Sequence, residues 1–395
     1  MNSSSIMPIA KRPDIVMTHG KGSYLYDEQG REYLDFVQGW AVNALGHSPK
    51  IIQETLYQQA NVLINPSPAF YNRPMIDLAD FLVANSCFDQ VFFANSGAEA
   101  NEGAIKLARK WGQKFKNGAY EIITFQSGFH GRTLTTMSAS GKPEWQGLFE
   151  PKTSGFCKAV YNDIDSVEAN ITEQTVAIML ELIQGEGGVI SARPDFVVGL
   201  ERIAKKHNLL LIVDEVQTGM ARTGSRFAYE KYSIQPDIMT LGKGLGGGVP
   251  ISALLSTRAV SCFDFGDQGG TFNGNPLMCA VALAVSKTVF EPKFLIHVQE
   301  HSHYLKSQLA QLSTEFSLGS VRGEGLLIGL NLNHRIAAHQ VAESARDSGL
   351  LINAPKPDIL RFMPALNLTN EETDKMIDIL SQIFVTRIDS STASF

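Results

Sequence analysis

The residue with the clearest chemical signature is Lys243, which stands in the glycine-rich run Gly242-Lys243-Gly244-Leu245-Gly246-Gly247-Gly248. Glycine allows a backbone to approach a bulky ligand closely. A lysine held beside an apolar strand end tends to lose its proton, and the neutral amine is a nucleophile. The run therefore predicts a lysine that forms a Schiff base with a carbonyl group.

Asp214 and Glu215 form an acidic pair directly after the apolar run at residues 209–213. An acid at the end of a buried strand is costly unless a cation meets it, and a protonated ring nitrogen or a metal ion would suffice. The alternative is a solvated loop acid. Lys243 follows Asp214 by one strand–loop–strand unit, so both side chains can line one crevice.

A third cluster, Asn95-Ser96-Gly97-Ala98-Glu99, opens a predicted helix. Ser96 and Glu99 match a capping box. Gly97 and Ala98 leave backbone amides uncovered at a helix N-terminus, which attracts phosphate. Taken alone, the cluster is more typical of an ordinary capped helix, because capping boxes are common.

The fourth cluster, Gly128-Phe129-His130-Gly131-Arg132-Thr133, combines an aromatic ring with a cation. Phe129 could lie against a planar ligand, and Arg132 could bind a carboxylate through two hydrogen bonds. A loop phenylalanine on the core with the arginine in solvent is the alternative. Together, a phosphate site, an aromatic ring, a buried acid and an enclosed lysine describe a pocket for pyridoxal phosphate.

Alternating strand-like and helical segments must position these clusters. The helix predicted over 98–115 has one apolar face, and a second helix is predicted over 196–207. This alternation predicts an α/β domain with a mainly parallel sheet, whose ligands bind at the carboxyl ends of the strands. The predicted strands are 90–94, 120–125, 176–182, 209–213, 238–241 and 251–255.

The last hundred residues predict a smaller α+β domain that begins near Pro292. Helices are expected from about 293 to 312 and after the capping-box run Thr369-Asn370-Glu371-Glu372, with strands at 326–332, 350–352 and 359–362. A hairpin-like stretch covers residues 23–36. The expected division is an N-terminal segment (1–50) that packs with the small domain, a large cofactor-binding domain (51–291) and a small C-terminal domain (292–395).

Composition excludes several classes of protein. The chain has 395 residues, of which 44% are hydrophobic and 19% charged, and its net charge is −6. This composition excludes a disordered chain, and the sequence has no excess of basic residues that would bind nucleic acid or anionic lipid. The four cysteines form no CxxC pair, and no segment matches a secretory signal or a membrane span. We expect a soluble cytoplasmic enzyme that binds neither nucleic acid nor membrane.

The chain resembles the class III pyridoxal-phosphate aminotransferases over nearly its whole length. The resemblance rests on the four clusters above, in the family's order and spacing, and on Ile183-Gln184-Gly185-Glu186-Gly187-Gly188, Asn273-Gly274-Asn275-Pro276 and Leu360-Arg361-Phe362. It implies aminotransferase fold type I, with a mainly parallel seven-stranded sheet in the large domain. It also implies a homodimer with its active sites at the subunit interface.

The resemblance implies a role for each site residue. Lys243 would carry the cofactor as an internal aldimine and later move the reacting proton, and Asp214 would pair with the ring nitrogen. The other cofactor-binding residues implied are Ser96, Gly97, Ala98, Phe129 and Gln217, with Thr271 reaching the phosphate from a neighbouring subunit. The substrate-binding residues implied are Arg132, Glu186, Arg361 and Trp40.

Glu186 and Arg361 are implied to form a switch. The pair would stay closed for a terminal amine and open for glutamate, whose carboxylate needs Arg361. The segment Gly39-Trp40-Ala41-Val42-Asn43 resembles family members that act on acylated ornithine rather than free ornithine. We therefore expect N-acetylornithine and 2-oxoglutarate as substrates, in arginine biosynthesis, with succinylated diamino acids, ornithine or 4-aminobutyrate as alternatives.

Three residues depart from the family pattern. Leu182 replaces a usual proline, Gly270 a usual serine or threonine, and Asn273 a usual glycine. The last two lie in the loop expected to meet the phosphate and the other subunit. These departures bear on cofactor affinity and leave the reaction type unchanged.

Three rival functions remain open at this point. Residues 242–247 match the GxGxxG dinucleotide fingerprint, but a strand rather than a helix is expected next. His297, His301 and His303 share one predicted helix, with a zinc-like spacing for the first two. We expect no metal site, because no HExxH pattern accompanies them. A catalytically inactive pyridoxal-binding regulator is the third rival.

Overall fold

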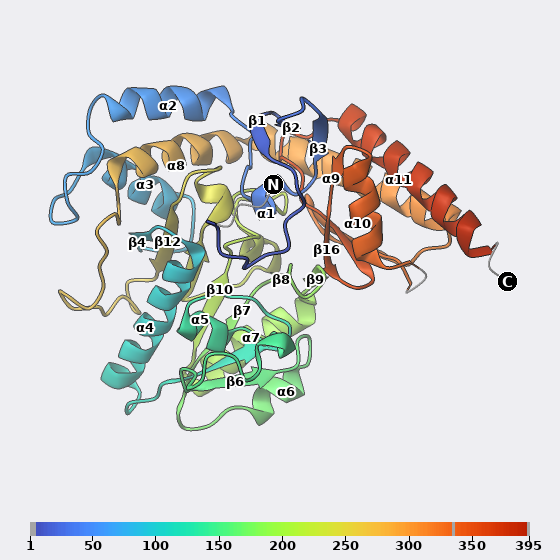
Figure 1. The fold of residues 1–395 in the computed structure, drawn as a ribbon. Helices are drawn as coiled ribbons and strands as arrows, with labels where there is room; N and C mark the ends of the chain where they lie inside the picture. Colours follow the sequence, from blue (N-terminus) through green and yellow to red (C-terminus); the bar gives the residue numbers. More distant parts are fainter. Residues whose placement is uncertain (1–4, 334–335, 393–395) are drawn as a thin grey trace.

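A seven-stranded sheet forms the centre of the large domain in the computed structural model, which describes residues 5–333 and 336–392 (Figure 1). The strand order is β4-β12-β11-β10-β7-β5-β6. Only β12 runs against its neighbours, so the prediction of a mainly parallel sheet is confirmed. The strands are β4 (Gln90–Ala94), β5 (Glu121–Phe125), β6 (Phe156–Ala159), β7 (Thr175–Leu180), β10 (Leu210–Asp214), β11 (Ile238–Leu241) and β12 (Ser252–Ser256).

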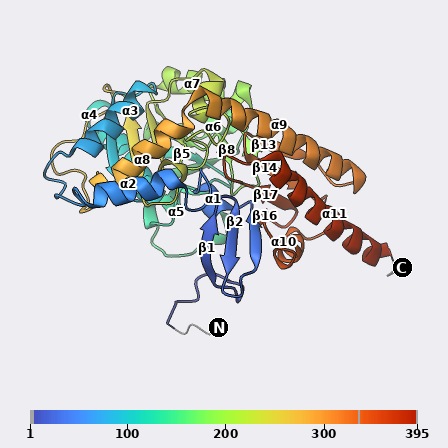
Figure 2. The same ribbon diagram turned by 90° about the horizontal axis from the view of Figure 1, so that it is seen from above.

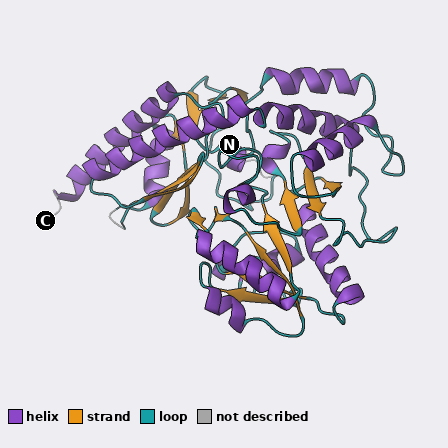
Figure 3. Ribbon diagram, turned by 180° about the vertical axis from the view of Figure 1, so that it is seen from behind, coloured by secondary structure: helices purple, strands orange, loops and turns teal. Residues whose placement is uncertain are grey.

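Helices cover both faces of this sheet (Figure 3). Alternate residues of β10 show the division: Leu210 and Ile212 pack with α4 (Gly97–Phe115), whereas Leu211 and Val213 pack with α7 (Pro194–His207). All residues of β7, β10, β11 and β12 are buried, which explains their nearly continuous apolar sequences. The remaining helices of this region are α2 (Lys50–Ala60), α3 (Arg73–Ala84), α5 (Leu134–Ala139), α6 (Ile164–Ala169) and α8 (Pro276–Val289).

The C-terminal region contains an antiparallel sheet in the order β13-β14-β17-β16. The predicted capping box is present, because Thr369 and Glu372 each accept the other's backbone N–H. The sequence did not predict β6, β13 or β16, whose residues include lysine, glycine or proline. The elements are α9 (Pro292–Glu315), β13 (Val321–Glu324), β14 (Leu327–Asn331), α10 (Ala338–Asp347), β16 (Asn353–Lys356), β17 (Ile359–Phe362) and α11 (Asn370–Thr392).

The N-terminal strands join this C-terminal region. β1 (Met17–Lys21), β2 (Tyr24–Asp27) and β3 (Glu32–Asp35) form a sheet with β15 (Leu350–Leu351). Figure 2 shows β1 and β2 on the side of the molecule that carries α10, and Lys375 of α11 pairs with Glu32 at 3.0 Å. The proposed boundaries at residues 50 and 292 stay predictions.

Short elements complete the description. They are α1 (Gln38–Ala41), the pair β8 (Ile183–Gln184) and β9 (Ile190–Ser191), and the 3₁₀ turns η1 (Pro143–Trp145), η2 (Ala228–Tyr232) and η3 (Lys243–Leu245). Within the described ranges, no helix has both the length and the apolar character that a bilayer crossing requires.

Candidate active site

A cavity of about 290 Å³ lies where β4, β10 and β11 end and α4 begins. All four clusters singled out from the sequence contribute to its wall. The predicted site residues that line it are Gly97, Ala98, Phe129, Arg132, Asp214, Gln217 and Lys243. Five further residues line it as well: Asn101, His130, Gly131, Glu181 and Val216.

The N-terminus of α4 forms one wall. Ser96 lies outside the cavity lining and acts as the helix cap: its hydroxyl accepts the Glu99 N–H at 3.3 Å, while Glu99 accepts the Ser96 N–H at 3.0 Å. A Cβ on Gly97 would lie 2.7 Å from Val216, so no larger residue fits there. Because the first turn of a helix has free amides, this wall suits a phosphate group.

Asp214 is 4% exposed and firmly held. Its Oδ2 accepts hydrogen bonds from His130 Nδ1 and Asn101 Nδ2, each at 2.8 Å, and its Oδ1 accepts the Val216 N–H at 3.1 Å. Since the carboxylate only accepts, His130 must carry its proton on Nδ1. The reading of Asp214 as a solvated loop acid is therefore wrong.

Lys243 lies between two glycines at the start of η3, with a φ of +42°. A non-glycine residue in this left-handed region is strained, and such strain gathers at functional sites. Burial lowers the pKa of Lys243, nearby Asp214 opposes that shift, and Arg361 lowers the pKa further. A larger fraction of neutral amine follows, as a nucleophile requires.

Arg361, which is buried, and Glu186, which is partly exposed, form an ion pair beside this cavity. Arg361 is completely buried, and its Nη2 donates to Glu186 Oε1 at 2.7 Å while its Nε donates to Asn353 at 2.9 Å. Its Nη1 is buried without a hydrogen-bond partner. Burial raises the pKa of Glu186, but Arg361 and Lys142 outweigh it and bring the pKa to about 2.

The comparisons with known proteins agree on one family. The aminotransferase class-III model matches residues 7–384. The chain is 60% identical to the acetylornithine aminotransferase of Ralstonia nicotianae over 95% of this chain and 96% of that protein. The chain belongs to the class-III aminotransferases. A relative named acetylornithine aminotransferase 2, from Bordetella pertussis, is 55% identical, with 96% of each chain covered.

Solved structures of class-III aminotransferases share the fold. The N-acetylornithine aminotransferase of Stenotrophomonas maltophilia has a TM-score of 0.85 at 35% identity, covering 96% of this chain and 98% of that one. The ornithine aminotransferase of Toxoplasma gondii has a TM-score of 0.93 at 30% identity, covering 98% and 94% respectively. The expected fold type I is thus confirmed.

Class-III aminotransferases use pyridoxal 5′-phosphate, and the residues present fit this group. The cavity combines uncovered helix amides, a buried carboxylate, an aromatic ring and a lysine with a lowered pKa. The backbone of Gly185 lies close to the Gln217 side chain, and a Cβ at this position would lie 1.8 Å from Gln217 Oε1. Glycine at this position lets Gln217 keep its place in the cavity wall.

Trp40 is half-exposed and lies near Arg361, whose Cζ is 5.7 Å from its ring centroid. Its segment is unusual, since all four residues of α1 have positive φ, from +48° to +67°. Asp35 anchors this left-handed turn by accepting the N–H groups of Val37 and Gln38 at 2.8 and 3.0 Å. Strain of this kind persists only where the surroundings fix it.

Thr271, which was expected to reach the phosphate from a neighbouring subunit, lies away from the cavity of its own chain. It is exposed and borders a hollow beside residues 65–68, outside the cavity lined by Gly97 and Ala98. Glu186, Arg361 and Trp40 also lie outside the cavity lining, although Arg361 and Glu186 influence the pKa of Lys243. Arg132 is exposed, and its Cζ lies 5.8 Å from the Trp145 ring.

Sequence reasoning missed Glu181 and Lys142 and assigned no role to Asn101. Glu181 accepts the Phe129 N–H at 2.9 Å, and burial together with Asp214 raises its pKa well above the ordinary value. Its place at the end of the apolar run 176–182 was the available signal. Glu215 is structural, because its oxygens accept the N–H groups of Ala228 and Tyr229 at 2.7 and 2.8 Å.

The three departures from the family pattern are accommodated differently. Leu182 is buried in the core. A Cβ on Gly270 would meet the Asn273 side chain at 2.7 Å, and Asn273 Oδ1 accepts a hydrogen bond from Asn95 at 2.9 Å. Gly270 and Asn273 are therefore complementary, since the small residue makes room for the larger one.

The structure gives evidence on two of the rival functions, the dinucleotide-binding enzyme and the metal hydrolase. The run at 242–247 forms the short turn η3 and leads to β12, so it does not open the helix of a dinucleotide site. His297 and His301 stack at 3.8 Å between ring centroids. In the described part of the chain, no group of three or more histidine, cysteine or acidic residues could hold a metal ion.

Proposed function

We propose that this aminotransferase transfers the terminal amino group of N-acetyl-L-ornithine to 2-oxoglutarate, giving N-acetyl-L-glutamate 5-semialdehyde and L-glutamate, a step of arginine biosynthesis. The observation that carries the proposal is the ion pair of the buried Arg361 with Glu186, beside Lys243. An arginine neutralised by a carboxylate tolerates a reacting carbon that has no carboxylate. The same arginine can bind glutamate once Glu186 withdraws. The names of the 55–60% identical relatives support this choice of substrate.

The proposed roles follow from the contacts. When bound, pyridoxal phosphate supplies a ring that accepts the electron pair released as the substrate carbon loses its proton. Lys243 Nζ takes that proton and returns it, and Asp214 keeps a negative charge available for the ring nitrogen. Amides of Gly97 and Ala98 would hold the phosphate, Phe129 would stack on the ring, and Gln217 would meet its phenolic oxygen.

Substrate contacts are proposed for the residues at the mouth of the site. Arg132 would bind the carboxylate remote from the reacting amine, because its guanidinium is exposed beside the cavity. Trp40 would contact the acyl group with its apolar ring. A second candidate substrate is N-succinylornithine, because the chain is 41% identical to the succinylornithine transaminase of Yersinia pseudotuberculosis.

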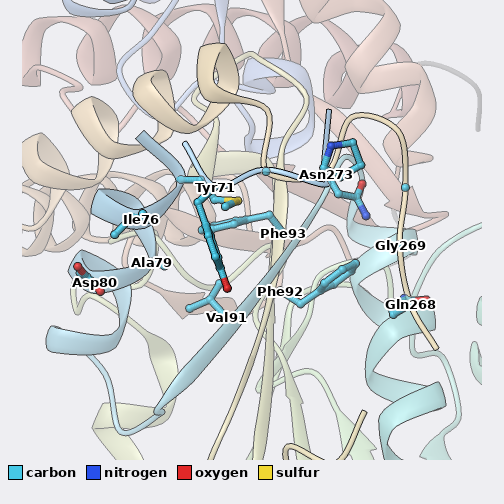
Figure 4. A pocket seen from close by; sticks show the side chains of 14 residues that line it. Tyr71, Ile76, Ala79, Asp80, Val91, Phe92, Phe93, Gln268, Gly269 and Asn273 are labelled. Atoms are coloured by element: carbon cyan, nitrogen blue, oxygen red, sulfur yellow. The ribbon is translucent and has the colours of Figure 1, made fainter. Parts of the chain in front are cut away.

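We also propose a homodimer in the cytoplasm. The position of Thr271 away from the cavity of its own chain supports a contribution to the phosphate site of a second copy. Figure 4 shows Tyr71, Phe92 and Asn273 around a neighbouring groove of about 440 Å³, and Tyr71 is 86% exposed. Light scattering tests the dimer, and Thr271→Ala should weaken cofactor retention.

The substrate proposal is tested by comparing kcat/KM for N-acetylornithine, N-succinylornithine, ornithine, succinyldiaminopimelate and 4-aminobutyrate, with 2-oxoglutarate as acceptor. N-acetylornithine should give the highest value, and a clear preference for ornithine or 4-aminobutyrate would overturn the assignment. Borohydride should attach the cofactor to the wild type and not to Lys243→Ala, which should fold normally and be inactive. Turnover of any of these amino donors would also exclude the alternative of a catalytically inactive pyridoxal-binding regulator.

A further inference from the structure

Glu186 has two cationic partners rather than one. Its Oε1 accepts from Arg361 Nη2 at 2.7 Å, and its Oε2 accepts from Lys142 Nζ at 3.0 Å. The Lys142 and Glu186 side chains are 21% and 29% exposed, so this contact is largely shielded from solvent. Shielded charge pairs are screened much less than surface pairs.

Lys142 is fixed independently of Glu186. Its Nζ lies 5.0 Å from the ring centroid of Phe129 and 5.4 Å from that of Trp145, within the range of cation–π attraction. The ammonium group therefore keeps its place between two aromatic rings when Glu186 moves. Lysine suits this position because its charge is a compact point with three donors.

Arg361 has the opposite arrangement. Nε is held by Asn353, Nη1 is buried without a partner, and Nη2 depends on Glu186. When Glu186 leaves, Nη1 and Nη2 form a free fork that matches the two oxygens of a carboxylate. This state is unfavourable for Glu186, because a partly buried carboxylate that loses its cationic partner is destabilised.

We propose that Lys142 is a positioning residue that retains Glu186 after it separates from Arg361, and thereby sets the balance between the two amino donors. This inference rests on the proposed function. Lys142 stabilises the open state, in which Arg361 can bind the carboxylate on the reacting carbon of glutamate or 2-oxoglutarate. The closed state used by the acylated ornithine keeps both partners and depends less on Lys142.

The test compares Lys142→Gln and Lys142→Arg with the wild-type holoenzyme. Each half-reaction is followed in a single turnover from the absorbance of the bound cofactor, with glutamate or N-acetylornithine as the only donor. Glutamine keeps a hydrogen-bond donor but has no charge, so Lys142→Gln should lower the glutamate-to-acetylornithine ratio of kmax/Kd about tenfold, which corresponds to about 1.4 kcal/mol. Lys142→Arg should restore it.

Binding of glutarate gives a readout that does not depend on turnover. This dicarboxylate has no reacting group, and calorimetry should show its Kd rising about tenfold in Lys142→Gln. Lys231→Gln is the matched control, because Lys231 pairs with Glu324 at 2.9 Å and both side chains are 31% exposed. The control should change neither the donor ratio nor the Kd for glutarate.

Two results would overturn the role of Lys142: an unchanged donor ratio, even where both half-reactions slow equally, or an unchanged Kd for glutarate. Failure of the proposed function looks different. In that case the wild type itself would react with glutamate and fail to react with N-acetylornithine, whereas the effect of Lys142→Gln on glutarate binding would still be measurable.

Discussion

Asn101 links three parts of the active site, and its replacement by alanine gives the sharpest test of how Asp214 is held. The side chain is 1% exposed. Its Nδ2 donates to Asp214 Oδ2 and to the His130 carbonyl, each at 2.8 Å, and its Oδ1 accepts from Thr240 Oγ1 at 2.7 Å. Alanine favours the interior of α4, so the lost hydrogen bonds dominate the effect.

The magnitude follows from these three bonds. The two bonds between uncharged groups contribute ~1 kcal/mol each and the bond to the carboxylate ~2 kcal/mol, which gives a loss of about 4 kcal/mol in the free energy of unfolding. His130 still holds Asp214 at 2.8 Å, so the carboxylate stays buried but loses one restraint. If the ~2 kcal/mol bond to Asp214 is fully expressed in cofactor affinity, the Kd rises about 30-fold.

The assay measures thermal unfolding and the Kd of pyridoxal phosphate for apoprotein, for Asn101→Ala and for Asn85→Ala. Asn85 is the control, because its side chain donates to Phe81 at 2.9 Å and accepts from Arg226 at 3.2 Å, away from the cavity. Asn85→Ala should lower stability and leave the Kd unchanged. The reasoning fails if both variants weaken cofactor binding equally, or if neither does.

Two further predictions concern pH and the loop before α8. Burial raises the pKa of Glu215 to about 7, above the unfolded-state value of 4.5, so the folded state binds this proton more tightly. Stability should fall by about 3 kcal/mol as pH rises from 4.5 to 7. Urea unfolding of Glu215→Gln should lack that decline, and an identical pH slope in both proteins would contradict the assignment. In the loop, Gly270→Ser should displace the Asn273 side chain and break its bond to Asn95, at a cost of about 1 kcal/mol. Asn273→Gly should remove that penalty, so a double-mutant cycle should show coupling of about 1 kcal/mol, whereas additive effects would exclude it.

Much of the fold could be predicted because local pattern and burial agree. The strands at 90–94, 238–241 and 359–362 have the predicted boundaries. The strand at 238–241 is marked by a nearly continuous apolar run, because all of its residues are buried within the sheet. β6, β13 and β16 were not predicted, since their pairing with neighbouring strands outweighs the weak strand preference of their own residues.

The sequence alone identified the chemistry of Lys243 and Asp214, because a glycine-enclosed lysine and an acid after a buried strand are local patterns. Only the tertiary structure revealed which groups hold them. Asn101, Glu181 and Lys142 come from distant parts of the chain, and their partners depend on how α4, β7 and the loop before η1 meet. A spacing along the chain specifies which residue types are available, whereas distances and desolvation, which set charge and pKa, arise only after packing.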